Sequence, residues 1–125
     1  MVILRRVQSS LTGSWRSTGR TAGQMEFFVE EPYRILSENM NAGYVNRLAD
    51  CVRKVMARND SEGIIITHGT DTLQYTAALL SYVFGTDCVP VLLVSSDFPL
   101  EDERANGMAN FMRAVEFIKC REGRG

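Results

Sequence analysis

A cluster of polar side chains at positions 67–72 is the part of the sequence best suited to chemistry. The run Thr67-His68-Gly69-Thr70-Asp71-Thr72 places hydroxyl groups beside a carboxylate. Such a pair can support nucleophilic attack, or activation of water, on a small polar substrate. If a helix begins there, its first free N–H groups can also stabilise an oxyanion. Thr70 and Asp71 are therefore candidate catalytic residues, and the alternative is that they only cap the helix through their side-chain oxygens.

The residues on either side predict the elements that position this cluster. Ile64, Ile65 and Ile66 form a β-branched run, typical of a strand buried on both faces. Gly69 allows a sharp turn after that strand, and mostly apolar residues over about 72–84 predict a helix directly afterwards. In open α/β sheets, ligands bind at such strand-to-helix corners. The cluster therefore lies where a binding site is expected.

Helical periodicity marks two further segments. Asn41 is a good helix cap, and the helix it predicts continues to about Arg58. Its buried face is predicted to consist of Val45, Leu48, Val52 and Val55. The helix predicted over about 104–119 has a buried stripe of Met108, Phe111, Met112, Val115 and Ile118. The helix over 72–84 is apolar nearly all round, so we expect it to be covered on most sides.

The order of these elements predicts an α/β fold. Residues 89–94 are a second apolar strand whose proline lies near its start. Alternating strands and helices are typical of right-handed βαβ units. We therefore expect a parallel sheet with helices on both faces, a three-layer arrangement of the Rossmann or flavodoxin type. Residues 1–30 are irregular, and only residues 2–4 resemble a strand.

Size and charge limit the possible classes of function. A chain of 125 residues fits one domain, and 45% hydrophobic with 23% charged residues is ordinary for a globular protein. The 14 basic and 15 acidic residues give a net charge of -1, which argues against nucleic-acid binding. No apolar run reaches the roughly 20 residues of a membrane helix. We expect a cytoplasmic protein that binds neither nucleic acid nor membrane.

Cysteine and histidine usage argues against a metal or redox site. Cys51, Cys88 and Cys120 are scattered and lack paired metal-ligand spacing, so we expect reduced thiols. His68 is the only histidine, which excludes a multi-histidine metal site, and we do not expect a Ser-His-Asp triad either. There is no Gly-x-Gly-x-x-Gly and no Walker lysine to hold a nucleotide. We expect neither a metal nor a cofactor.

The polar cluster belongs to a longer stretch that resembles a known family. The run at 67–73, followed by Tyr75-Thr76-Ala77, is similar to the second signature of the bacterial-type L-asparaginases. The similarity continues through residues 90–94, and Ser37-Glu38 stands where that family has a substrate-binding serine and its neighbour. It covers roughly residues 31–118. The resemblance implies the fold of an asparaginase N-terminal domain.

The resemblance also implies an activity, the hydrolysis of the side-chain amide of L-asparagine to L-aspartate and ammonia. A threonine attacks the amide, and water then releases aspartate from the acyl-enzyme. Thr70 and Asp71 match a pair that supports this reaction together with a lysine. Asp71 would also bind the ammonium group of the substrate, Ser37, next to Glu38, its carboxylate, and Ser96 would offer a backbone contact beside the leaving amide. The resemblance implies a homo-oligomer for the complete protein.

Two features depart from the family pattern. The family's nucleophile lies in a Thr-Gly-Gly-Thr-Ile turn, whereas this chain has Leu11-Thr12-Gly13-Ser14-Trp15-Arg16. Thr12 is therefore the candidate nucleophile, and Thr18 is a second, weaker candidate. The family's lysine and its C-terminal domain would follow residue 125, and Lys119 is better explained as a solvated helix residue.

These departures bear on activity. We expect residues 1–125 to be an incomplete N-terminal domain with little activity alone, because losing one member of a catalytic unit costs orders of magnitude in rate. The alternative is a non-catalytic, degenerate or fragmentary remnant that binds an amino acid.

Overall fold

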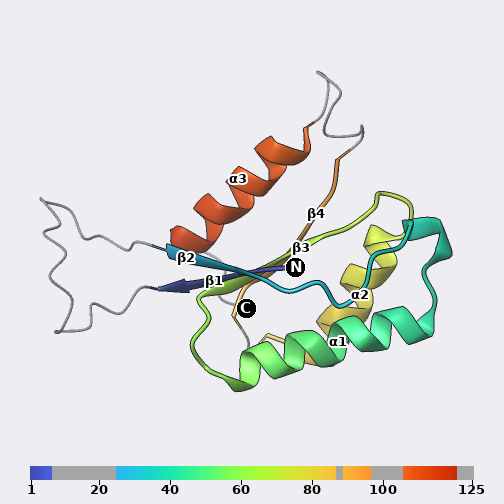
Figure 1. Ribbon diagram of the computed structural model, residues 1–125, viewed down its shortest axis with the longest axis horizontal. Coiled ribbons are helices and arrows are strands. Elements are labelled where there is room, and N and C mark those ends of the chain that lie inside the picture. Colours follow the sequence, from blue (N-terminus) through green and yellow to red (C-terminus); the bar gives the residue numbers. More distant parts are fainter. Residues whose placement is uncertain (7–24, 87–88, 97–105, 121–125) are drawn as a thin grey trace, which may run out of the picture.

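The computed structural model describes residues 1–6, 25–86, 89–96 and 106–120 (Figure 1). Strands and helices alternate from β3 onward, and the predicted α/β class is confirmed. The elements are, in chain order, β1 (Val2–Arg6), β2 (Met25–Val29), the 3₁₀ helix η1 (Ser37–Asn39), α1 (Ala42–Ala57), β3 (Gly63–Thr67), α2 (Leu73–Phe84), β4 (Val91–Val94) and α3 (Gly107–Lys119).

The four strands form one sheet in the order β2-β1-β3-β4. β3 and β4 are parallel, as expected, but β1 is antiparallel to both of its neighbours, and β2 was not expected at all. β1 and β2 pair over their full length, from Val2↔Val29 to Arg6↔Met25. Two consecutive strands can pair in parallel only when a crossover connection, usually a helix, joins them. The sequence between β1 and β2 has no helical period, which is consistent with their antiparallel pairing. β2, β3 and β4 therefore share one direction, and β1 opposes them.

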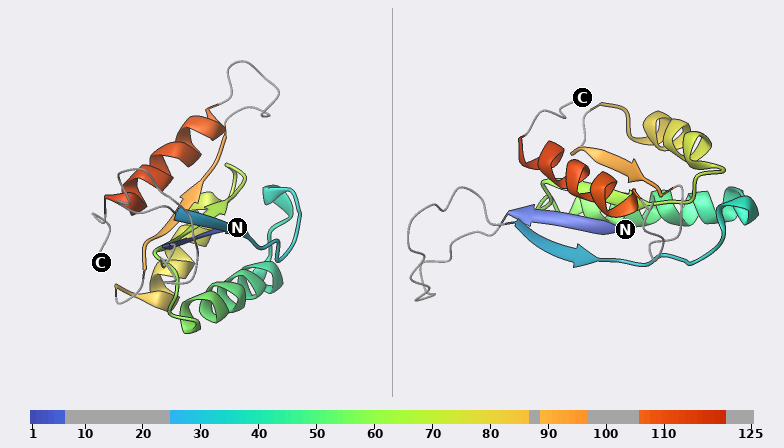
Figure 2. Two further views of the ribbon diagram at one scale, coloured as in Figure 1. Left: turned by 60° about the vertical axis from the view of Figure 1, so that its left-hand side comes forward. Right: turned by 90° about the horizontal axis from the view of Figure 1, so that it is seen from above.

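The helices cover both faces of the sheet, which completes the expected three layers (Figures 1 and 2). Ile64 and Ile66 face α1 and α2, whereas Ile65 faces α3, because side chains alternate along a strand. All three isoleucines are buried. On the first face they pack with Ile3, Leu48, Ala49, Val52, Val55 and Leu80, and on the second with Ala114, Val115 and Ile118.

The helix α1 forms as its sequence predicts. The Asn41 side chain accepts hydrogen bonds from the backbone N–H groups of Gly43 at 2.9 Å and Tyr44 at 3.2 Å. These bonds satisfy two of the donors that a helix leaves free at its first turn. The four predicted core residues of α1 are all buried.

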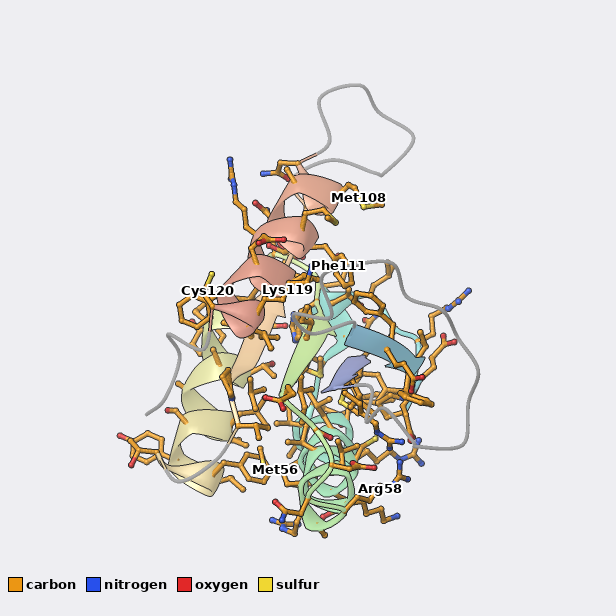
Figure 3. All side chains as sticks on the ribbon, turned by 90° about the vertical axis from the view of Figure 1, so that its left-hand side faces the viewer. Met56, Arg58, Met108, Phe111, Lys119 and Cys120 are labelled. Atoms are coloured by element: carbon orange, nitrogen blue, oxygen red, sulfur yellow. The ribbon has the colours of Figure 1, made fainter. Side chains whose placement is uncertain are left out.

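One prediction of burial is wrong, and a second is only partly confirmed. α2 buries only Thr76 and Leu80, while Tyr82 is 92% exposed, because α2 packs on the sheet along one side alone. On α3, Val115 and Ile118 are buried as predicted, but Met108 is 63% and Met112 50% exposed. The buried residues of α3 lie in its C-terminal half, and Figure 3 shows Met108 at the end of the helix away from the strands.

β4 is an edge strand with apolar side chains on both faces, and each of its residues is only half-buried. A groove of about 320 Å³ runs beside it, between α2 and Phe117 of α3, and no side chain that lines it is ionisable. Among the described residues, no helix has the length and hydropathy that crossing a membrane requires.

Gly63, the first residue of β3, packs closely against Ile118 of α3. A Cβ at this position would lie 2.6 Å from Cδ1 and 2.8 Å from Cγ1 of Ile118. We expect Gly63→Ala to lower the free energy of unfolding by about 1–3 kcal/mol through overpacking, measured by urea denaturation. In an Ile118→Ala background the same change should cost much less, and an equal cost in both backgrounds would contradict this packing.

The outer side of α2 exposes Tyr75, Leu79, Tyr82 and Val83, and the helix contains no charged residue. We expect the chain to self-associate at micromolar concentration because of this apolar stripe. Tyr82→Lys should shift sedimentation-velocity profiles toward monomer. Asn46→Lys on the exposed side of α1 adds the same charge as a control and should not; equal shifts from both variants would refute a role for α2.

Candidate functional site

The turn between β3 and α2 carries the signature residues. α2 begins after Thr72, whose carbonyl accepts backbone hydrogen bonds from Tyr75 at 3.2 Å and Thr76 at 3.1 Å. The Thr72 side chain makes no capping hydrogen bond. The sequence prediction that side-chain oxygens of this turn cap α2 is therefore wrong for its N-cap residue, and backbone bonds to its carbonyl start the helix.

His68 ties this turn to its neighbours. Its Nδ1 lies 2.7 Å from the carbonyl oxygen of Gly69, and its Nε2 lies 2.9 Å from the hydroxyl oxygen of Thr76. Its backbone N–H donates to the carbonyl of Val94 at 2.9 Å, which extends the β3–β4 pairing by one step. Sequence reasoning used His68 only to exclude other sites and missed this structural role.

Thr70 and Asp71 lie in this turn, and both are exposed. The backbone carbonyl of Asp71 accepts a hydrogen bond from the Gln74 side chain at 3.3 Å. Ser96 lies two residues beyond the end of β4, and the preceding carbonyl, of Ser95, accepts from the Asn110 amide at 2.9 Å. Because β3 and β4 are parallel, their carboxyl ends lie at the same end of the sheet. Thr70 and Asp71 follow the carboxyl end of β3, and Ser96 follows that of β4.

Ser37 and Glu38 form the start of η1, and Glu38 is exposed. η1 follows β2, which shares its direction with β3 and β4, and both figures show η1 at the same end of the sheet as the β3–α2 turn (Figures 1 and 2).

Thr12, the candidate nucleophile, and Thr18 lie outside the described residues. Lys119 lies in the last turn of α3 with its Nζ 3.5 Å from Glu116 Oε1, as expected for a solvated lysine (Figure 3).

A cavity of about 350 Å³ lies at this end of the sheet. It is lined by Met1, residues 29–35, Met40, Leu48 and residues 66–69. The turn thus contributes its first half to the cavity wall, up to Gly69, while Thr70 and Asp71 are not among the lining residues. The segment after β2 was not predicted to form this wall, because nothing in residues 29–35 has the type or spacing of a known motif.

Glu30 is the main charged group of the cavity wall. Its backbone carbonyl accepts from the Met1 ammonium group at 2.8 Å, and its carboxylate lies 3.4 Å from Nη1 of Arg58 and 3.9 Å from Sγ of Cys51. The Glu31 carboxylate is 2.7 Å from Arg34 Nε, an exposed pair of the kind that contributes little to stability. The wall therefore carries two carboxylates, of Glu30 and Glu31, and two cationic groups, the Met1 ammonium and the Arg34 guanidinium, so it offers partners for both charged ends of a zwitterion.

Partial burial changes the proton affinity of groups along this wall. It lowers the pKa of the Met1 ammonium group, although nearby negative groups oppose this, and it raises the pKa of Tyr33. The Tyr33 hydroxyl donates to Met40 Sδ at 3.7 Å. Burial first, and the neighbouring Glu30 carboxylate second, raise the pKa of the Cys51 thiol. The part of the chain that the structure describes has no group of three or more residues suited to hold a metal ion.

Comparison with known proteins places this arrangement in a wider context. A family described as "Asparaginase, N-terminal" matches residues 6–125. The chain is 45% identical over 89 residues to a glutamyl-tRNA(Gln) amidotransferase subunit of Methanococcus vannielii, covering 68% of this chain and 20% of the relative. It is 38% identical over 96 residues to a glutaminase-asparaginase of Pseudomonas fluorescens, covering 77% and 26%.

A solved structure is similar as well. L-asparaginase I from Vibrio cholerae superimposes with a TM-score of 0.61 at 33% identity, over 67% of this chain and 25% of that one. The chain spans between 20% and 26% of the length of these relatives.

The raised pKa of Cys51 provides a test of its contact with Glu30, a residue of the cavity wall. A raised pKa keeps the thiol protonated to higher pH, so alkylation by iodoacetamide should rise at higher pH than for a free cysteine. The measurement uses a Cys88→Ser/Cys120→Ser chain to isolate Cys51. Glu30→Gln should lower the pH midpoint of alkylation only in part, because burial, the larger cause of the raised pKa, remains. Glu31→Gln is the matched control and should leave it in place; an unmoved midpoint in Glu30→Gln would contradict the contact.

Proposed function

The chain belongs to the asparaginase family, and we propose that it is part of an amidohydrolase that converts L-asparagine to L-aspartate and ammonia. The observation that carries this proposal is the turn from His68 to Thr72. It leaves the carboxyl end of a buried strand and borders a cavity whose wall carries both acidic and cationic groups. A free amino acid carries an ammonium and a carboxylate group, so its pocket needs an acid and hydrogen-bond donors close together.

The roles that we propose follow the family resemblance. Thr12 attacks the side-chain amide, and Thr70 and Asp71 support proton transfer. Asp71 also binds the substrate ammonium group, and Ser37 binds its carboxylate, with Glu38 beside it as a further substrate-binding residue. Ser96 offers a backbone contact beside the leaving amide. We further propose a homo-oligomer in the cytoplasm, in line with the composition of the chain and the family. These roles require the turn to bring Thr70 and Asp71, one and two residues beyond the Gly69 that lines the cavity, over it.

A second candidate is hydrolysis of the longer amide of glutamine. It is favoured by the relative named glutaminase-asparaginase, whose name states both activities. The relatives named as amidotransferase subunits add a related possibility, that the released ammonia serves a transfer reaction in a larger assembly. The alternative without catalysis is an amino-acid-binding remnant.

Release of ammonia from asparagine and from glutamine, followed by a coupled glutamate dehydrogenase assay, tests the proposal. We expect a low rate that is higher with asparagine. Asp71→Asn should reduce kcat/KM by about 10- to 100-fold, the loss expected for a hydrogen bond to a charged group. Asp50→Asn, on the exposed side of α1 and paired with Arg53, is the control and should leave the rate unchanged.

The outcomes separate the candidates. A higher rate with glutamine favours the second candidate. Calorimetric binding of L-aspartate without turnover, lost in Asp71→Ala, favours the binding remnant. A chain that neither turns over nor binds these amino acids contradicts the proposal, as does an equal loss in the Asp71 and Asp50 variants.

A further inference from the structure

The contacts of the His68 ring define which nitrogen carries the hydrogen when the ring is neutral. A carbonyl oxygen can only accept, so the 2.7 Å contact with the Gly69 carbonyl requires a hydrogen on Nδ1. In the neutral ring Nε2 then carries no hydrogen and accepts one. The Thr76 hydroxyl, 2.9 Å away, is the donor. The neutral ring thus links the carbonyl of the signature turn to Thr76, in the first turn of α2, through one tautomer.

Thr76 is suited to hold the ring in place. It is 2% exposed, and it is the one buried polar residue in the part of the chain that the structure describes. A buried hydroxyl needs a hydrogen-bond partner, and His68 supplies it. Since α2 is fixed to the core through Leu80 on the same side, Thr76 presents its hydroxyl from a rigid element.

The turn is held from the other side as well. The His68 N–H donates to the Val94 carbonyl at 2.9 Å, which anchors the backbone just before the turn to β4. The side chain of His68 then fixes the Gly69 carbonyl, which belongs to the peptide that leads into Thr70. With both groups held, that peptide has little freedom to rotate.

We propose that His68 and Thr76 act as a positioning pair that sets the direction in which Thr70 and Asp71 leave β3. The importance of this pair for catalysis rests on the proposed function, whereas the contacts that define the pair do not depend on it. Neither residue has to touch substrate. The pair orders the turn together with the backbone hydrogen bonds to the Thr72 carbonyl. A misplacement of about 1 Å at reacting groups can cost as much as 100-fold in rate.

Two matched substitutions separate the hydroxyl from the shape of the side chain. Thr76→Val keeps the shape and removes the donor, and Thr76→Ser keeps the donor and loses only a methyl group. The ¹⁵N shifts of the His68 ring report its tautomer, and the backbone amide signals of Thr70 and Asp71 report the turn. We expect the Nδ1–H tautomer in the parent chain and in Thr76→Ser. In Thr76→Val the ring should become a mixture of tautomers, with both amide signals shifted and those of α3 unchanged.

Substitutions of the ring test the other contact. His68→Asn can place an N–H where Nδ1 lies and should keep the turn amides closer to the parent than His68→Gln, which reaches toward Thr76 alone. An Nε2–H tautomer in the parent, or a Thr76→Val chain with unchanged ring and amide signals, would overturn the proposal. Where ammonia release is measurable, Thr76→Val should lower kcat/KM about tenfold and Thr76→Ser less than twofold. A chain that releases no ammonia counts against the proposed function, while the NMR signals still decide the positioning pair.

Discussion

The burial of β3 on both faces is the constraint on which the rest of this molecule depends. Three consecutive isoleucines divide their side chains between two cores, so α1 and α2 on one side and α3 on the other are fixed to the same five residues. The tight approach of Ile118 to Gly63 shows how little space remains at the start of this strand. A strand held in this way leaves its carboxyl end in a defined place, and the signature turn begins there.

The site depends on this rigidity and on hydrogen bonds that span elements. His68 continues the pairing with β4 through its backbone and reaches α2 through its ring. Across the cavity, Glu30 joins β2 to α1 through Arg58 and to the start of β1 through its carbonyl. The two sides of the cavity are therefore built from different parts of the sheet, and only one of them carries a recognisable signature.

The sequence could predict those features that depend on residues close together along the chain. The cap at Asn41, the buried face of α1 and the β3–α2–β4 order are set by neighbours within a few residues, and these predictions are confirmed. The direction of β1 depends on pairing with Phe28 and Ile64, which lie far along the chain, and no local pattern encodes it. The exposure of Tyr82 and Met108 depends on how far the sheet extends under each helix. For the site, residue types pointed to Thr70 and Asp71, but the cavity wall at residues 29–35 is formed by backbone path rather than by motif.

The pairing of β1 with β3 also bears on how the chain folds. Ile3 lies opposite Ile64, so the two partners are about sixty residues apart along the chain, whereas β3, α2, β4 and α3 are consecutive. Closing a long loop costs more entropy than a short one, and such contacts slow folding. The consecutive unit can therefore form early, and Met1 and the segment after β2 can join it only when β1 docks. The wall of the cavity is then complete only after β1 has docked on β3.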